Sequence, residues 1–167
     1  TGKVERNIVT HAHSDHARPG HISYLSHRSS EPLLRARIGK KINIQTLDYE
    51  KQISINGVNV SLHPSRHIYG AAQVRVEENG EVWVVTGDYK LEDDGLSAPY
   101  QPVKCHHFIT ECTFGLPVYH WPDQHEVYQK INNWWLDNKN IGITSILFGY
   151  SLGKSQRIIR NIDHSIG

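Results

Sequence analysis

Three histidines and an aspartate fall within six consecutive positions, in the order His11-Ala12-His13-Ser14-Asp15-His16. Side chains at positions i and i+2 of an extended segment point the same way, so His11 and His13 can converge on one metal ion. A turn after Ser14 can then bring Asp15 and His16 to a neighbouring ion. Imidazole and carboxylate ligands together suit zinc, manganese or iron rather than calcium. This loop therefore predicts a metal site that could hold two ions.

Two further ligands must come from elsewhere in the chain. Each ion of an open catalytic site takes about three protein ligands, and the loop supplies only four groups for two ions. His67, in the segment HPSRHIYGAAQ, and Asp88, in TGDYK, are the candidates because each lies at the end of a strand-like run. Ligands at strand ends are held by a rigid scaffold. A single histidine elsewhere in a chain is more often a surface or capping residue. The assignment of His67 and Asp88 as ligands therefore depends on their order in the sequence and their positions at strand ends.

The elements that must position these groups are short strands and a few helices. The residue pattern predicts strands at 7–10, 42–45, 106–110 and 143–148 and helices at 31–40, 123–138 and 152–162. Two hairpins are predicted, 51–55 with 58–63 around Asn56-Gly57, and 72–77 with 81–86 around Glu78-Asn79-Gly80. Residues 91–101 read as the one extended, exposed loop. Hairpins early and helices between later strands indicate a mixed α/β fold of packed layers.

Composition excludes several classes of protein. The 167 residues suit one domain, and a net charge of +1 provides no global attraction to a nucleic acid or membrane. No apolar run approaches the roughly 18 residues of a membrane span, and the N-terminus has no signal-peptide core, so we expect a cytoplasmic protein without membrane contact. Cys105 and Cys112 are too few for a disulfide framework. A chain without methionine is expected to be a segment of a longer protein.

The loop HAHSDH resembles the HxHxDH motif of the metallo-β-lactamase superfamily, and His67 and Asp88 match its later ligands in order and local sequence. TECTFG, with Glu111, is similar to the carboxylate motif of the β-CASP nuclease branch, and YSLGKSQR resembles the start of the β-CASP insertion. Four segments together resemble the bacterial ligase-associated DNA exonucleases, also described as mRNA 3′-end-processing-like proteins: HARPGH, LHPSRHIYGAAQV, VVTGDYKLE and FITECTFGLPVYHWP. The resemblance runs over essentially the whole chain.

The resemblance implies an αββα sandwich, incomplete at both ends over residues 1–148, with residues 149–167 beginning a β-CASP-like insertion. It implies that His11, His13 and His67 hold one divalent ion, that Asp15 and His16 hold a second, and that Asp88 bridges them. Zinc is expected, with manganese as the alternative. In the family a downstream histidine completes the second ion, and another, oriented by the carboxylate corresponding to Glu111, protonates the leaving group. This chain ends before either histidine.

The activity implied is hydrolysis of nucleic acid by a metal-activated hydroxide, with Asp15, Asp88 and Glu111 as the catalytic carboxylates. Arg18, Lys90, Lys154 and Arg157 are the expected substrate contacts. The expected substrate is DNA rather than RNA. The expected enzyme is an exonuclease that acts in DNA repair or ligation, in functional association with a DNA ligase. Alternatives left open are an RNA-processing nuclease, a small-molecule metallo-hydrolase, and a metal-binding fragment without catalytic activity.

Overall fold

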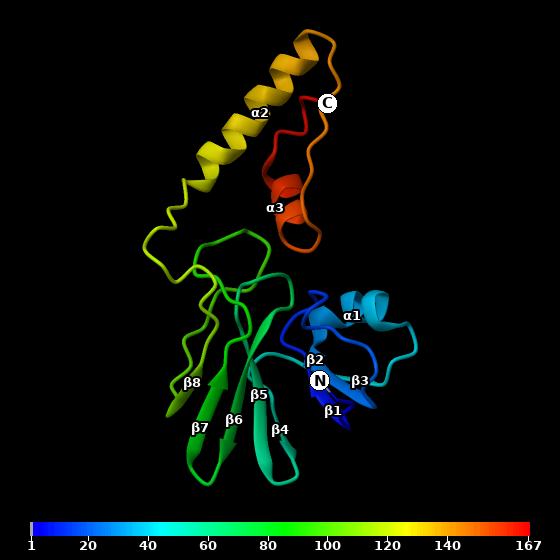
Figure 1. Ribbon diagram of the computed structural model, residues 1–167, viewed down its shortest axis with the longest axis vertical. Coiled ribbons are helices and arrows are strands. Elements are labelled where there is room, and N and C mark those ends of the chain that lie inside the picture. The colour runs from blue at the N-terminus through cyan, green and yellow to red at the C-terminus, as the bar shows by residue number, and fades with distance from the viewer. Residues whose placement is uncertain (1) are drawn as a thin grey trace. The chain divides into compact units, whose positions relative to one another are not determined.

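The computed structural model describes residues 2–167, which form two compact units (Figure 1). The first unit ends at Glu111 and contains every strand of the described chain. The second runs from Cys112 to Gly167 and contains two α-helices. The boundary between residues 148 and 149 that the resemblance implies falls within the second unit and stays a prediction. No helix in the described part of the chain has both the length and the apolar character that crossing a bilayer requires.

The first unit begins with a parallel three-stranded sheet in the order β1-β2-β3. Its strands are β1 (Arg6–Ile8), β2 (Ser23–His27) and β3 (Ile44–Leu47). The crossover from β2 to β3 passes through the 3-10 turn η1 (Arg28–Ser30) and helix α1 (Glu31–Ile38). Pro32 stands in the first turn of α1, where its missing N–H costs no hydrogen bond, and Leu34 is fully buried. The predicted helix at 31–40 is confirmed.

A second, mainly antiparallel sheet follows, in the order β4-β5-β6-β7-β8. Its strands are β4 (Gln52–Ile55), β5 (Val58–Pro64), β6 (Ala72–Glu78), β7 (Glu81–Val85) and β8 (His107–Ile109). Both predicted hairpins are confirmed. Asn56 and Gly57 have φ values of 51° and 86°, and Asn79 and Gly80 have 50° and 83°. Positive φ at both central positions is what a two-residue type I′ turn requires.

The two sheets pack against each other around one hydrophobic core. Leu25 and Leu47 of the three-stranded sheet meet Val60, Leu62 and Val74 of the five-stranded sheet. Leu25 and Leu62 are completely buried. The predicted mixed α/β fold with layered sheets is therefore confirmed.

The second unit consists of helix α2 (Gln124–Asn140), helix α3 (Lys154–Asn161) and the segments around them. Asp123 caps α2 by accepting hydrogen bonds from the backbone N–H groups of His125 and Glu126. The strand predicted at 143–148 is wrong. Among the described residues of this unit there is no strand with which it could pair, and its apolar side chains are exposed, Phe148 to 89%.

Candidate metal centre

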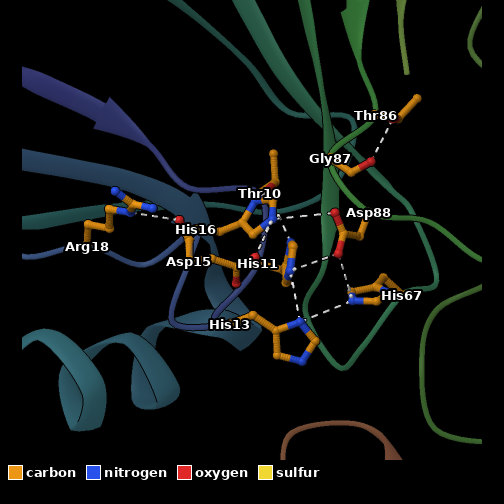
Figure 2. A network of polar contacts seen from close by, with 10 residues as sticks. All are labelled: Thr10, His11, His13, Asp15, His16, Arg18, His67, Thr86, Gly87 and Asp88. Carbon is orange, nitrogen blue, oxygen red and sulfur yellow. Dashed lines mark hydrogen bonds and ion pairs between the residues drawn. The ribbon is translucent and has the colours of Figure 1, made fainter. Parts of the chain in front are cut away.

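The histidine-rich loop begins where β1 ends. The backbone N–H of Val9 still bonds to Leu25 O in β2, and the chain then leaves the sheet. The N–H groups of His16 and Ala17 both donate to the carbonyl oxygen of His13, which closes the turn that the sequence predicted after Ser14. Ala12 and Ala17 are buried and anchor the loop. Figure 2 shows the loop imidazoles of His11, His13 and His16 gathered beside His67 and Asp88.

His67 lies in the loop between β5 and β6. Ser65 N donates to Ala71 O, and Ala71 N donates to Ile68 O, so the loop is closed by its own backbone. Gly70 has a φ of 78°, and an added Cβ would stand 2.6 Å from the hydroxyl of Ser30. The Ser30 hydroxyl donates to Gly70 O at 2.8 Å. This loop is therefore packed tightly against the start of α1, which fixes the position of His67.

Asp88 follows β7 by three residues. Thr86 is completely buried, and its N–H donates to Ile109 O of the neighbouring strand β8. Gly87 has a φ of 56°, and a Cβ there would lie 2.7 Å from Cβ of Thr10. Only glycine can adopt this positive φ and also leave room for the Thr10 side chain without strain. The close approach of Gly87 to Thr10 delivers the Asp88 carboxylate to the histidine-rich loop.

Four donor groups form the first part of the site: His11, His13, His67 and Asp88, whose ligand atoms all lie within 4.8 Å of one another. His13 Nδ1 is 3.0 Å from His11 Nε2 and 3.1 Å from His67 Nε2. Asp88 Oδ2 is 3.3 Å from His67 Nε2 and 3.7 Å from His11 Nε2. Ligands about 2.0–2.1 Å from a tetrahedral ion are separated by about 3.3 Å. The donor set fits a divalent ion such as zinc in both spacing and chemistry.

The other oxygen of Asp88 faces a second group of donors. Asp88 Oδ1 is 3.4 Å from His16 Nε2, and that nitrogen is 3.6 Å from Asp15 Oδ2. The Asp15 side chain is 70% exposed, so this group is open to solvent. The Asp88 carboxylate thus stands between two groups of donors, with Oδ2 toward His11 and Oδ1 toward His16 (Figure 2). A carboxylate in that position can bridge two ions.

Burial keeps the central imidazoles neutral. It lowers the pKa of His11 to about 2, and the neighbouring His16, His67 and His13 rings add to the effect. Burial also lowers the pKa of His67 to about 4, although the negative charges of Asp88 and Glu111 oppose it. A metal ion binds the neutral imidazole, so at neutral pH no proton has to be displaced from either ring.

The remaining candidate residues have different surroundings. Glu111 is near enough to act electrostatically on His67. Arg18 donates from Nε to the backbone carbonyl of Asp15 at 3.0 Å. Lys154 and Arg157 belong to α3 in the second unit, where the Lys154 ammonium lies 5.6 Å from the centre of the Tyr150 ring. Their proposed contact with substrate stays a prediction.

Lys90 lies directly before a segment for which the sequence-based prediction was wrong. Residues 91–101 were expected to be exposed, but Asp94 and Ser97 are buried. Asp94 accepts hydrogen bonds from Lys90 Nζ at 2.7 Å, from the N–H groups of Leu96 and Ser97, and from the Ser97 hydroxyl. Burial alone would raise the pKa of Asp94, but these bonds outweigh it and lower the pKa to about 2. Lys90 is therefore engaged in an ion pair beside the site.

Several other histidines have structural partners. His27 stacks on Tyr49 with ring centroids 3.5 Å apart, and His107 stacks on Trp83 at 3.8 Å. His63 is hydrogen-bonded to Ser61 and Gln101. The histidine content of the chain thus serves both the fold and the site. In the sequence, the loop spacing distinguished His11, His13 and His16, and order and setting distinguished His67.

Sequence reasoning missed Thr10, which belongs to the site. Its hydroxyl oxygen is 3.2 Å from His11 Nδ1 and 3.4 Å from His16 Nδ1. The signal that could have found it is its position, directly before the first histidine of the loop. A hydroxyl there can reach the side of an imidazole that faces away from the ion.

Fold and site together define a two-sheet α/β protein with a cluster of three histidines and a shared aspartate that could hold a metal ion. No family model matches the chain. It is similar to a protein named probable DNA ligase from Opitutus terrae, with 34% identity over 164 residues, 96% of this chain and 16% of that protein. It is also similar to the endoribonuclease YSH1 of Yarrowia lipolytica, with 31% identity over 136 residues, 80% of this chain and 16% of that protein.

A solved structure shares the fold. The chain superimposes on a protein of unknown function from Enterococcus faecalis V583 with a TM-score of 0.57 and 15% identity, over 79% of this chain and 39% of that one. At this identity the likeness concerns the fold alone. The chain spans about one sixth of the length of the two curated relatives described above.

Proposed function

We propose that this chain belongs to the β-CASP branch of the metallo-β-lactamase superfamily and provides the metal-binding part of a nuclease that hydrolyses phosphodiester bonds in nucleic acid. The observation that carries the proposal is the position of Asp88, with Oδ2 toward His11 and His67 and Oδ1 toward His16. Such a shared carboxylate suits a pair of ions acting on one phosphate. The similarity to endoribonucleases supports the same chemistry.

The residues of this chain have separate parts in that reaction. His11, His13, His67 and Asp88 would hold one ion, and Asp15, His16 and Asp88 the other. When bound, divalent ions supply an activated water and positive charge at the scissile phosphate. The buried imidazole of His11 and the half-buried imidazole of His67 remain neutral and available as ligands, because the pKa of each ring is lowered. Glu111 would act on the site as a negative charge near His67, which its electrostatic effect on that ring supports.

The substrate proposed is DNA, cleaved from an end. Support comes from the relative named for DNA ligation, which matches 96% of the chain, whereas the endoribonuclease of Yarrowia lipolytica matches 80%. A functional association with a DNA ligase belongs to the same proposal. The second candidate is RNA cleavage, which the endoribonuclease similarity favours. Hydrolysis of a small molecule has no such support.

The test uses the purified full-length protein with zinc or manganese and end-labelled DNA and RNA strands of one sequence. Stepwise shortening of DNA from one end is expected, with RNA cut at least tenfold more slowly. Internal cleavage of RNA alone would establish the second candidate instead. Hydrolysis of neither polymer, by a protein that binds two ions, would refute the nuclease proposal. A chromogenic lactam in the same buffer serves as the small-molecule control.

A further inference from the structure

The hydroxyl of Thr10 lies between two imidazoles that belong to different parts of the metal centre. Its Oγ1 is 3.2 Å from His11 Nδ1 and 3.4 Å from His16 Nδ1 (Figure 2). His11 belongs to the four-donor group, and His16 faces the other oxygen of Asp88. One hydroxyl therefore contacts a prospective ligand of each ion.

The direction of the two rings determines where their protons must lie. Both rings turn Nε2 toward Asp88, at 3.7 Å for His11 and 3.4 Å for His16. Nε2 is thus the nitrogen that would ligate, and an imidazole that ligates through Nε2 carries its proton on Nδ1. A hydroxyl oxygen has two lone pairs and can accept from both N–H groups. Thr10 can therefore hold both rings in the tautomer that metal binding needs.

Thr10 is itself fixed in place by its neighbours. The backbone N–H of Ala72, the first residue of β6, donates to Thr10 O at 2.8 Å. The backbone of Gly87 approaches so closely that a Cβ there would stand 2.8 Å from Thr10 Oγ1. A β-branched side chain has few rotamers, and this packing reduces them further. The hydroxyl is therefore preorganised before any ion binds.

We propose that Thr10 is a positioning residue that couples the two halves of the metal centre by accepting one hydrogen bond from His11 and one from His16. The inference rests on the proposed function to the extent that it requires metal ions at these ligands. Partners that hydrogen-bond to a metal ligand typically change metal affinity 10–100-fold when they are removed. Because Thr10 serves one ligand of each ion, its loss weakens the binding of both.

The test compares Thr10→Val, which keeps the shape and removes the hydroxyl, with Thr10→Ser, which keeps the hydroxyl. Thr46→Val, on β3, is the matched control. Zinc affinity is measured by competition with a chelating dye, and the cobalt(II)-loaded proteins are compared by visible absorption. In Thr10→Val the affinity for both ions is expected to fall about 10–100-fold with an altered cobalt spectrum. Thr10→Ser is expected to stay within about threefold of the wild type.

Normal affinity and spectrum in Thr10→Val would overturn the inference, and so would a loss confined to one ion or an equal loss in Thr10→Ser. A measurement on the wild type covers the case in which the valine variant fails to fold. Nitrogen-15 spectra of the histidine rings in the zinc-loaded protein should show Nδ1–H in both His11 and His16, and Nε2–H in either ring would contradict the assignment.

The result can be separated from the fate of the proposed function. Two tightly bound ions without cleavage of nucleic acid would refute the function while leaving the role of Thr10 intact. Cleavage of nucleic acid by the wild type, together with normal metal affinity and cobalt spectrum in Thr10→Val, would support the function and refute the role of Thr10. A wild-type protein that binds no ion would overturn both.

Discussion

Replacing Asp88 by alanine tests the central feature of the site. Its carboxylate faces both groups of donors, with Oδ2 toward His11 and His67 and Oδ1 toward His16. The substitution removes one of four donors from the first set and one of three from the second. It also removes the negative charge that the two ions would share. Because the side chain lies at the surface end of the site and is 32% exposed, most of the fold should remain.

The size of the effect can be bounded from this geometry. Removal of a group that only hydrogen-bonds to a ligand costs 10–100-fold in metal affinity, so loss of a direct donor should cost at least that much at each ion. A factor of 10–100 corresponds to about 1.4–2.7 kcal/mol per ion. Cleavage, which needs both ions together, should fall below detection.

Two measurements check this prediction. Elemental analysis after gel filtration gives the bound metal per chain, and a labelled oligonucleotide gives the rate of cleavage by the full-length protein. Asp137→Ala, an exposed position on α2, makes the same chemical change away from the strand ends and should match the wild type in both. Unchanged turnover with normal metal content in Asp88→Ala would refute the bridging role.

Three further predictions concern the backbone at Gly87, the ion pair of Asp94 and the binding of zinc. Gly87→Ala should destabilise the protein by at least about 1–2 kcal/mol more than Gly80→Ala, because both have positive φ but only Gly87 abuts Thr10; urea unfolding measures the difference, and equal costs would contradict it. Asp94→Asn should cost about 2 kcal/mol at pH 6, since the pKa of the folded state lies about two units below its ordinary value. That stability is present above the ordinary pKa and is lost as the pH falls from about 5 to 2, so the difference from wild type should vanish near pH 2; a constant difference would disprove the assignment to the ion pair with Lys90. Zinc at about 100 times its dissociation constant should stabilise the folded protein by about 2.7 kcal/mol, and a chelator should reverse the shift in melting temperature; an unchanged melting temperature would count against a metal centre.

Features that depend on neighbouring residues could be predicted from the sequence. The i and i+2 spacing placed His11 and His13 together, and the Asn-Gly pairs located both hairpins, because each depends on local backbone geometry. Helix α2 could be predicted for the same reason, since its apolar spacing and the Asp123 cap lie within one continuous segment.

Features that depend on partners far away in the sequence could not be predicted from the sequence. Strand β2 was missed because serine and histidine interrupt its apolar residues, yet it lies in the middle of its sheet and pairs with strands on both sides. The segment 143–148 has strand-like residues but no strand beside it within the described part of its unit. The prediction for the loop at 91–101 was wrong for a different reason: its polar composition suggested exposure, yet Asp94 is buried and hydrogen-bonded to Lys90 and Ser97, which lie within four residues of it.

The same distinction explains how the metal centre is assembled. Spacing alone indicates that His11 and His13 can share an ion, but it says nothing about how Asp88 arrives beside them. That depends on Gly87, whose left-handed backbone and missing side chain allow β7 to approach Thr10. Thr10 in turn touches His11 and His16 through its hydroxyl, so one contact between two strand ends sets the position of a carboxylate and the orientation of two imidazoles. Gly87 and Thr10 therefore belong to the site as much as the prospective ligands do, although neither can bind the ion through an imidazole or a carboxylate.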